Sequence, residues 1–79
     1  MNIKIKYFGM LSECCGKSEE NREVSEDTSL SELKNELLRT YPTLAEKQYK
    51  IAVNQKISDG DEDLSEGDEI ALLPPFAGG

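Results

Sequence analysis

The segment from Ser29 to Tyr41 constrains the fold most, because it predicts one strongly amphipathic helix. Ser29-Leu30-Ser31-Glu32 matches a capping box, in which Ser29 is the N-cap residue and Glu32 reaches back to the Ser29 backbone N–H. Pro42 predicts that the helix ends at Tyr41. A single apolar stripe needs a sheet to cover it. The stripe consists of residues at helical spacing: Leu30, Leu33, Leu37, Leu38 and Tyr41.

The segments on either side of this helix show the two-residue alternation of half-buried β-strands. Residues 2–8 alternate, so that one face carries Ile3, Ile5 and Tyr7 and the other carries Asn2, Lys4 and Lys6. Residues 49–53 alternate in the same way, with Tyr49, Ile51 and Val53 on one face. Residues 69–73 form the last predicted strand.

Two further strands have weaker signals. Residues 22–25 are a candidate second strand, after a charged loop at residues 17–21. Asn54-Gln55 predicts a reversal into a short return strand at residues 56–58, and residues 65–68 predict a turn before the last strand. The order is strand, strand, helix, strand, short strand, strand. It predicts an α+β domain with a mixed sheet of four to five strands and one main helix on one face.

Residues 10–15 predict a short helical turn that lays Met10, Leu11 and Cys14 inward and ends at Gly16. Cys14 and Cys15 are adjacent, so neither can link distant parts of the fold, and a disulfide between neighbours is strained. We expect one cysteine to face the core and the other to be incidental. A redox-active or sulfur-handling dithiol is the alternative.

Length and charge limit the functional classes. A chain of 79 residues forms one domain, and with 37% hydrophobic residues and no tryptophan it cannot also enclose a roomy substrate cavity. Nine basic and sixteen acidic residues give a net charge of −7, which argues against nucleic acid or an anionic membrane and favours partners with basic surfaces. Without a membrane-length apolar stretch or a secretory leader, the sequence predicts a cytoplasmic protein.

The chain offers little catalytic chemistry of its own. It has no histidine, no Gly-x-Ser-x-Gly elbow and no phosphate-binding Gly-x-x-x-x-Gly-Lys loop. Asp59, Asp61 and Asp63 match the first three ligands of a calcium-binding EF-hand loop, but Leu64 stands where glycine is required and Ile70 where glutamate is required. We therefore expect a solvated loop, no metal, and a carrier on which other proteins perform chemistry.

The C-terminal residues suggest what is carried. After the apolar run at residues 70–73, Pro74 and Pro75 favour an extended spacer because their φ angles are fixed. Gly78 and Gly79 can enter spaces where a Cβ would clash. We expect a domain at residues 1–73 and a flexible tail at residues 74–79 whose working group is the Gly79 carboxylate. The alternative is a frayed end without a role.

With this tail, the strand and helix order resembles the small subunit of molybdopterin synthase, in the MoaD/ThiS family of ubiquitin-like sulfur carriers. The resemblance covers essentially the whole chain and implies the β-grasp fold. It is also carried by Lys4-Ile5-Lys6-Tyr7-Phe8-Gly9, Ala52-Val53-Asn54-Gln55 and Glu66-Gly67-Asp68-Glu69-Ile70-Ala71. Two features depart from the family pattern: family members commonly carry valine at the position of Phe76, and adjacent cysteines are not typical.

The resemblance implies a carrier that is not catalytic alone but is the sulfur-donating subunit of a transferase. An ATP-dependent adenylyltransferase of the ubiquitin-activating type would adenylate Gly79, and a sulfur donor protein would convert it to a thiocarboxylate. The tail would then enter the large subunit of the synthase and donate sulfur to cyclic pyranopterin monophosphate in molybdenum cofactor biosynthesis. The carrier itself would bind no cofactor.

The same resemblance assigns roles near the tail. Pro74, Pro75, Ala77 and Gly78 would give the tail access to narrow active sites. A docking patch for partners would consist of Phe8, Leu72, Leu73 and Phe76, although strand alternation requires Leu72 or Leu73 to face the core. Asp68 and Glu69 would steer a basic partner towards the carrier. Alternatively, Asp68 would only be part of a solvated turn.

Three other functions remain open. The protein could be a ubiquitin-like modifier joined to lysines through Gly79, or a sulfur carrier for thiamine or tRNA thiolation, against which the proline pair counts. It could also be a plain interaction module with an idle tail, in which case removing Gly79 would leave molybdoenzyme activity intact.

Overall fold

In the computed structural model, which describes residues 1–58 and 60–75, five strands form one mixed sheet in the order β2-β1-β5-β3-β4. The sequence predictions for residues 76–79 lie outside the described residues. The strands are β1 (Asn2–Tyr7), β2 (Glu19–Glu23), β3 (Lys50–Val53), β4 (Lys56–Ile57) and β5 (Glu69–Leu73). The helices are α1 (Met10–Cys15), α2 (Leu30–Thr40) and the 3₁₀ helix η1 (Pro42–Glu46).

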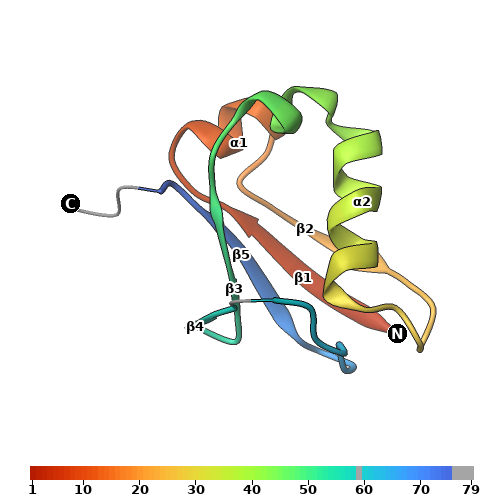
Figure 1. The fold of residues 1–79 in the computed structure, drawn as a ribbon. Coiled ribbons are helices and arrows are strands. Elements are labelled where there is room, and N and C mark those ends of the chain that lie inside the picture. Colours follow the sequence, from red (N-terminus) through yellow and green to blue (C-terminus); the bar gives the residue numbers. More distant parts are fainter. Residues whose placement is uncertain (59, 76–79) are drawn as a thin grey trace.

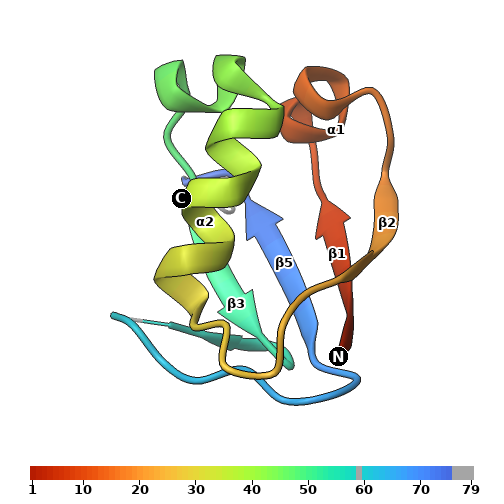
Figure 2. The same cartoon turned by 90° about the vertical axis from the view of Figure 1, so that its right-hand side faces the viewer.

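The first and last strands in the sequence lie side by side in the middle of the sheet. β1 and β5 pair in parallel, with Ile5 opposite Ile70 and Tyr7 opposite Leu72, whereas the other strand pairs are antiparallel. A parallel pair needs a long crossover connection, and α2 lies within it. The helix crosses one face of the sheet in both views (Figure 1, Figure 2). The α+β prediction, with one main helix on a mixed sheet, is confirmed.

The hydrophobic core lies between α2 and the sheet. Alternation along β1 buries Ile3, Ile5 and Tyr7, as predicted, whereas Lys4 and Lys6 face away from the helix and are only half-buried. Burial of each aliphatic side chain in such a core contributes roughly 1.5–3 kcal/mol. Side chains with 1% or less of their surface exposed form the centre of the core: Ile3, Ile5, Leu11, Leu33, Leu44, Ile70 and Leu72.

The predicted capping box opens α2. The Glu32 backbone N–H donates to Ser29 Oγ over 3.4 Å, and the Ser29 N–H donates to Glu32 Oε1 over 2.9 Å. The helix ends at Thr40, with Tyr41 as its C-cap residue. Asp61, which was expected only in a solvated loop, accepts hydrogen bonds from the Ser31 N–H and Oγ at 2.8 and 2.9 Å. Its exposed loop is therefore fastened to the first turn of α2.

Two elements differ from their predictions. The second strand spans Glu19–Glu23 instead of the predicted residues 22–25. The prediction missed its position because this edge strand has charged residues on both faces and no apolar alternation to mark it. In α1, Leu11 and Cys15 are buried, whereas Met10 is 47% exposed and Cys14 is half-buried. A helix of six residues is too short to define an apolar stripe from sequence.

The expectation that one cysteine faces the core is confirmed, and the buried one is Cys15. Burial raises the pKa of the Cys15 thiol to about 11, and the neighbouring Cys14 adds to the increase. This thiol is therefore protonated at neutral pH and is a poor nucleophile.

Candidate functional site

Three strands meet where the chain leaves the sheet. β5 ends at Leu73, which lies opposite Lys50 at the start of β3. On its other side, the Phe8 N–H donates to the Leu72 carbonyl over 3.1 Å, just beyond the end of β1. The chain therefore leaves the sheet after Leu73, at a fixed point between β1 and β3.

The chain after β1 makes a tight turn beneath this point. Gly9 has φ 58° and ψ −136°, close to the first central residue of a type II′ β-turn. The Leu11 N–H closes the turn by donating to the Phe8 carbonyl over 3.1 Å. A Cβ added at Gly9 would lie 3.0 Å from Pro74 Cγ, so Pro74 packs against the bare face of this glycine.

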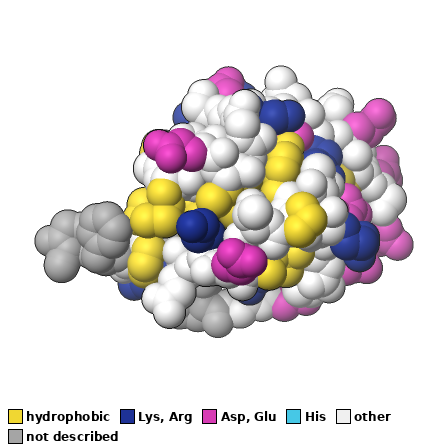
Figure 3. Space-filling view, turned by 90° about the horizontal axis from the view of Figure 1, so that it is seen from above, with side chains coloured by type: hydrophobic (Ala, Val, Ile, Leu, Met, Phe, Trp, Pro, Cys, Tyr) yellow, Lys and Arg dark blue, Asp and Glu magenta, His cyan; other side chains and the backbone are white. Residues whose placement is uncertain are grey.

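Apolar side chains surround the exit. We define the exit patch as Phe8, Leu73, Pro74 and Pro75; the Phe8 side chain is 44% exposed and the other three residues are half-buried. Figure 3 shows hydrophobic side chains gathered at the end of the molecule where the described chain stops. Met10, predicted to face inward, is exposed on the first turn of α1 and adds apolar surface close to Phe8 in the sequence.

Leu72 does not belong to this surface. Only 1% of its surface is exposed. It lies opposite Tyr7 of β1 and Ile51 of β3, so its side chain points to the same, inner face of the sheet as theirs. Its inclusion in the docking patch is therefore wrong, whereas the alternation argument, which required Leu72 or Leu73 to face the core, is confirmed. Phe76, Ala77, Gly78 and Gly79 lie outside the described residues.

The two acidic residues proposed to steer a partner have internal contacts. Lys6 Nζ lies 2.9 Å from Glu69 Oε2 across the β1–β5 pair, and this hydrogen-bonded partner raises the pKa of the lysine. Asp68 accepts hydrogen bonds from the Ser65 N–H at 2.7 Å and from Asn54 Nδ2 at 2.9 Å. Asp68 thus stabilises the turn in which it lies, which is the alternative that the sequence left open.

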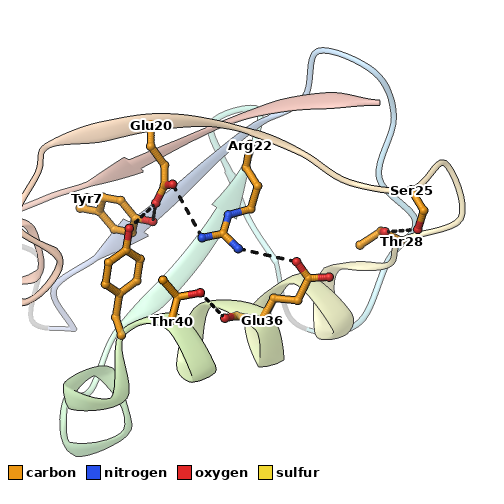
Figure 4. Close-up of polar contacts among 8 residues, drawn as sticks. Tyr7, Glu20, Arg22, Ser25, Thr28, Glu36 and Thr40 are labelled. Carbon is orange, nitrogen blue, oxygen red and sulfur yellow. Dashed lines mark hydrogen bonds and ion pairs between the residues drawn. The ribbon is translucent and has the colours of Figure 1, made fainter.

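A polar cluster that sequence reasoning missed supports the end of β1. Glu20 Oε1 accepts hydrogen bonds from the hydroxyls of Tyr7 at 2.5 Å and Tyr41 at 2.8 Å (Figure 4). Arg22 Nη2 lies 3.7 Å from Glu20 Oε2, and Arg22 Nη1 lies 3.6 Å from Glu36 Oε1. These ion pairs extend the cluster from β2 to α2. Tyr7 directly precedes Phe8, so the cluster holds the end of β1 next to one residue of the exit patch. No pattern in the sequence signals such a contact between three separate elements.

The cluster has defined electrostatics. Burial opposes ionisation of Glu20, but the hydrogen bonds from Tyr7 and Tyr41 and the nearby Arg22 outweigh it and lower the pKa of this carboxyl. Burial, followed by the hydrogen bond to Glu20, raises the pKa of Tyr7. At neutral pH, Glu20 is therefore a carboxylate that accepts hydrogen bonds from the hydroxyls of Tyr7 and Tyr41.

The described residues show neither a metal-binding cluster nor a membrane-spanning helix. Across residues 1–58 and 60–75, no three His, Cys, Asp or Glu side chains are grouped so that they could hold a metal ion. Within the same ranges, none of the helices has the length and apolar character needed to cross a membrane.

Comparison with known sequences finds similar proteins along the whole length of the chain. A model of the ThiS family matches residues 5–79. The chain is 34% identical over 82 residues to the molybdopterin synthase sulfur carrier subunit of Mycobacterium tuberculosis, covering 100% of this chain and 99% of the relative. It is 36% identical over 83 residues to the subunit of the same name from Caenorhabditis elegans, with the same coverage of both chains.

Solved structures of similar proteins superpose on this fold. A Pyrococcus furiosus protein named as a molybdopterin converting factor, subunit 1, superposes with a TM-score of 0.87 at 26% identity, covering 94% of this chain and 97% of that chain. A chain in a Helicobacter pylori complex of subunits 1 and 2 of molybdopterin-converting factor gives 0.72 at 29% identity, with full coverage of both. Small archaeal modifier protein 1 from Haloferax volcanii gives 0.80 at 22% identity, covering 92% and 95%, which shows a shared fold alone. The predicted ubiquitin-like β-grasp fold is confirmed.

Proposed function

Because the chain belongs to the ThiS family, we propose that it is a sulfur carrier and acts as the small subunit of molybdopterin synthase. The observation that carries this proposal is the full-length match to sulfur carrier subunits, which includes the Gly-Gly end. Curated relatives of that name are the basis for choosing molybdenum cofactor biosynthesis over thiamine or tRNA thiolation.

The proposed working group is the α-carboxyl of Gly79. A carboxylate is a poor electrophile, so an ATP-dependent adenylyltransferase first converts it to an acyl-adenylate and provides AMP as a leaving group. A donor protein then supplies sulfur at the oxidation level of sulfide, and its attack on the acyl-adenylate expels AMP and leaves a thiocarboxylate at Gly79. In the large subunit, this thiocarboxylate donates its sulfur to cyclic pyranopterin monophosphate.

In this scheme the chain's own residues present the tail and do not catalyse. The fixed exit at Leu73 and Pro74 lets a partner bind the body of the protein and receive the tail in one orientation. The exit patch supplies apolar surface for that contact, and the exposed ring of Phe8 is its largest described side chain. The large subunit is the proposed partner, a choice supported by the structural likeness to a subunit 1 that was solved with its subunit 2.

Intact-protein mass spectrometry tests the proposal directly. The chain is incubated with ATP, a sulfur donor and the adenylyltransferase, and we expect the mass change for sulfur replacing oxygen, localised to Gly79. A chain lacking Gly79 is the matched control; it should retain the same thermal stability and gain no sulfur. The loaded chain, mixed with the large subunit and cyclic pyranopterin monophosphate, should then yield molybdopterin.

Two outcomes would contradict this function. The carboxylate could stay unmodified although the same enzyme loads a known carrier, which would indicate an inert module. Alternatively, Gly79 could become joined to lysines of other proteins without thiocarboxylate formation, which would indicate a protein modifier.

A further inference from the structure

We propose that Gly9 is a positioning residue that sets the direction in which the tail leaves the sheet, so that sulfur loading depends on a bare backbone at this position. The inference rests on the proposed function, because loading is its kinetic readout. It assigns a role to a residue that is distant from Gly79 in the sequence and contributes no side chain.

The backbone of Gly9 is held in a conformation that suits glycine. Its φ of 58° and ψ of −136° lie where an L-residue clashes with its own backbone. The turn is fixed on its far side as well, because the Gly9 carbonyl accepts from both the N–H and the hydroxyl of Ser12, at 3.1 and 2.8 Å. Gly9 therefore cannot move freely to make room for a neighbour.

The space in front of Gly9 is occupied by Pro74. A Cβ at residue 9 would lie 3.0 Å from Pro74 Cγ and 4.0 Å from Pro74 Cδ. The proline ring is closed on its own backbone, so it cannot swing away as a flexible side chain would. Relief of the contact requires Pro74 to give by a few tenths of an ångström, through a change in ring pucker or a shift of its backbone.

The residues before Pro74 cannot absorb this shift. Leu72 is fully buried and accepts the hydrogen bond from the Phe8 N–H, and Leu73 is paired with Lys50 of β3. A backbone displacement at Pro74 would therefore pass to Pro75 and change the direction in which the chain leaves the sheet.

This geometry predicts a specific kinetic defect for Gly9→Ala. A partner that still docks on the exit patch would bind the variant, but the Gly79 carboxylate would be misplaced for adenylation. We expect kcat for thiocarboxylate formation to fall about tenfold while KM stays within about twofold, since a misplacement of 1 Å can cost about 100-fold in rate.

Gly16→Ala is the matched control. Gly16 also has a positive φ, 75°, but a Cβ there would meet nothing within 4 Å. It should lose stability through backbone strain and keep the wild-type rate of loading. Thermal unfolding of both variants separates loss of fold from loss of rate. Equal loading by Gly9→Ala and Gly16→Ala would overturn the proposal.

Pro74→Ala identifies the contact itself. Removing the ring takes away the atoms that a Cβ at residue 9 would strike, so adding Gly9→Ala to Pro74→Ala should lower kcat by less than twofold. If Gly9→Ala lowers kcat tenfold in both backgrounds, backbone strain and not Pro74 is responsible, and the inference is wrong.

One measurement needs neither folded variants nor partner enzymes. In the wild-type protein, a nuclear Overhauser effect between a Gly9 Hα and the Pro74 Hγ protons is expected, and its absence would overturn the proposed contact. A wild-type chain that shows this signal but is not loaded by an enzyme active on a known carrier would instead count against the proposed function alone.

Discussion

The hydroxyl of Tyr7 donates a 2.5 Å hydrogen bond to Glu20, and this contact fastens the last residue of β1 to β2. Tyr41 binds the same carboxylate oxygen from the end of α2, and its ring packs edge-to-face on Tyr7 with centroids 5.9 Å apart. One carboxylate therefore holds the ends of β1 and α2 against β2.

Replacing Tyr7 by phenylalanine should remove this hydrogen bond and keep the packing of the ring. Because the acceptor is charged and the site is mostly buried, we expect a loss of about 1.5 kcal/mol in the free energy of unfolding, measured with urea. Tyr49→Phe is the control, since the Tyr49 hydroxyl makes no hydrogen bond to another described residue. A loss no larger than that of the control would contradict the role given to the Tyr7 hydroxyl.

The lowered pKa of Glu20 predicts a dependence of stability on pH. In the folded protein this carboxyl titrates below the ordinary glutamate value of 4.5, so at lower pH the unfolded chain takes up its proton first. The stabilisation is fully present above that value and is lost as pH falls through the folded pKa. The difference in unfolding free energy between the wild type and Glu20→Gln should therefore be constant from pH 7 to about 5 and shrink below about 4.

Removal of the N-cap of α2 should cost less than removal of a core side chain. Ser29→Ala deletes the acceptor for the Glu32 N–H and is expected to lower the free energy of unfolding by about 1 kcal/mol. The exposed Ser18 offers a control, because its side chain has no hydrogen bond within the described part of the chain. An unchanged urea midpoint for Ser29→Ala would show that Asp61 alone suffices to hold the helix start.

Binding to the large subunit should distinguish two exposed hydrophobic residues. Phe8 is 44% exposed beside the exit, and Ile57 is 52% exposed on β4. Phe8→Ala should weaken binding about tenfold, as expected for an apolar anchor at an interface, whereas Ile57→Ala should bind like the wild type. Calorimetric titration of each variant measures this directly. Equal affinities would remove Phe8 from the docking surface.

The two cysteines should differ in stability and reactivity but not in function. Cys15→Ser places a hydroxyl in the core and should cost about 1–3 kcal/mol, whereas Cys14→Ser should cost less. Iodoacetamide should alkylate Cys14 of the native protein faster, because Cys15 is buried and its pKa is raised. Sulfur loading at Gly79 should persist in both variants. Loss of loading in a folded Cys14→Ser variant would revive the dithiol interpretation.

Where local patterns determine structure, the elements could be predicted from the sequence alone. The capping box at Ser29 marks the start of α2, and the Asn54-Gln55 turn has the positive φ angles, 50° and 72°, of a tight hairpin. The second strand begins about three residues before its predicted start, and η1 lies in a segment for which the sequence predicts no element, because neither segment has an apolar period of its own.

The features that build the site depend on contacts between distant residues. Whether Leu72 or Leu73 faces the core follows only from the register of β5 against β1 and β3. The packing of Pro74 on Gly9 requires the two ends of the sequence to be adjacent, and no local motif encodes that distance. The proposed chemistry at Gly79, by contrast, could be predicted from the sequence, because it follows from residue types and family resemblance without any geometry.

The central position of β5 has a consequence for biosynthesis. β1 is synthesised before β5, and its inner edge stays unpaired until Glu69–Leu73 have been translated. A product that stops short of this strand lacks the centre of its sheet and would be cleared as an unfolded chain. The sheet is thus completed only when the chain has been synthesised through Leu73, directly before Pro74.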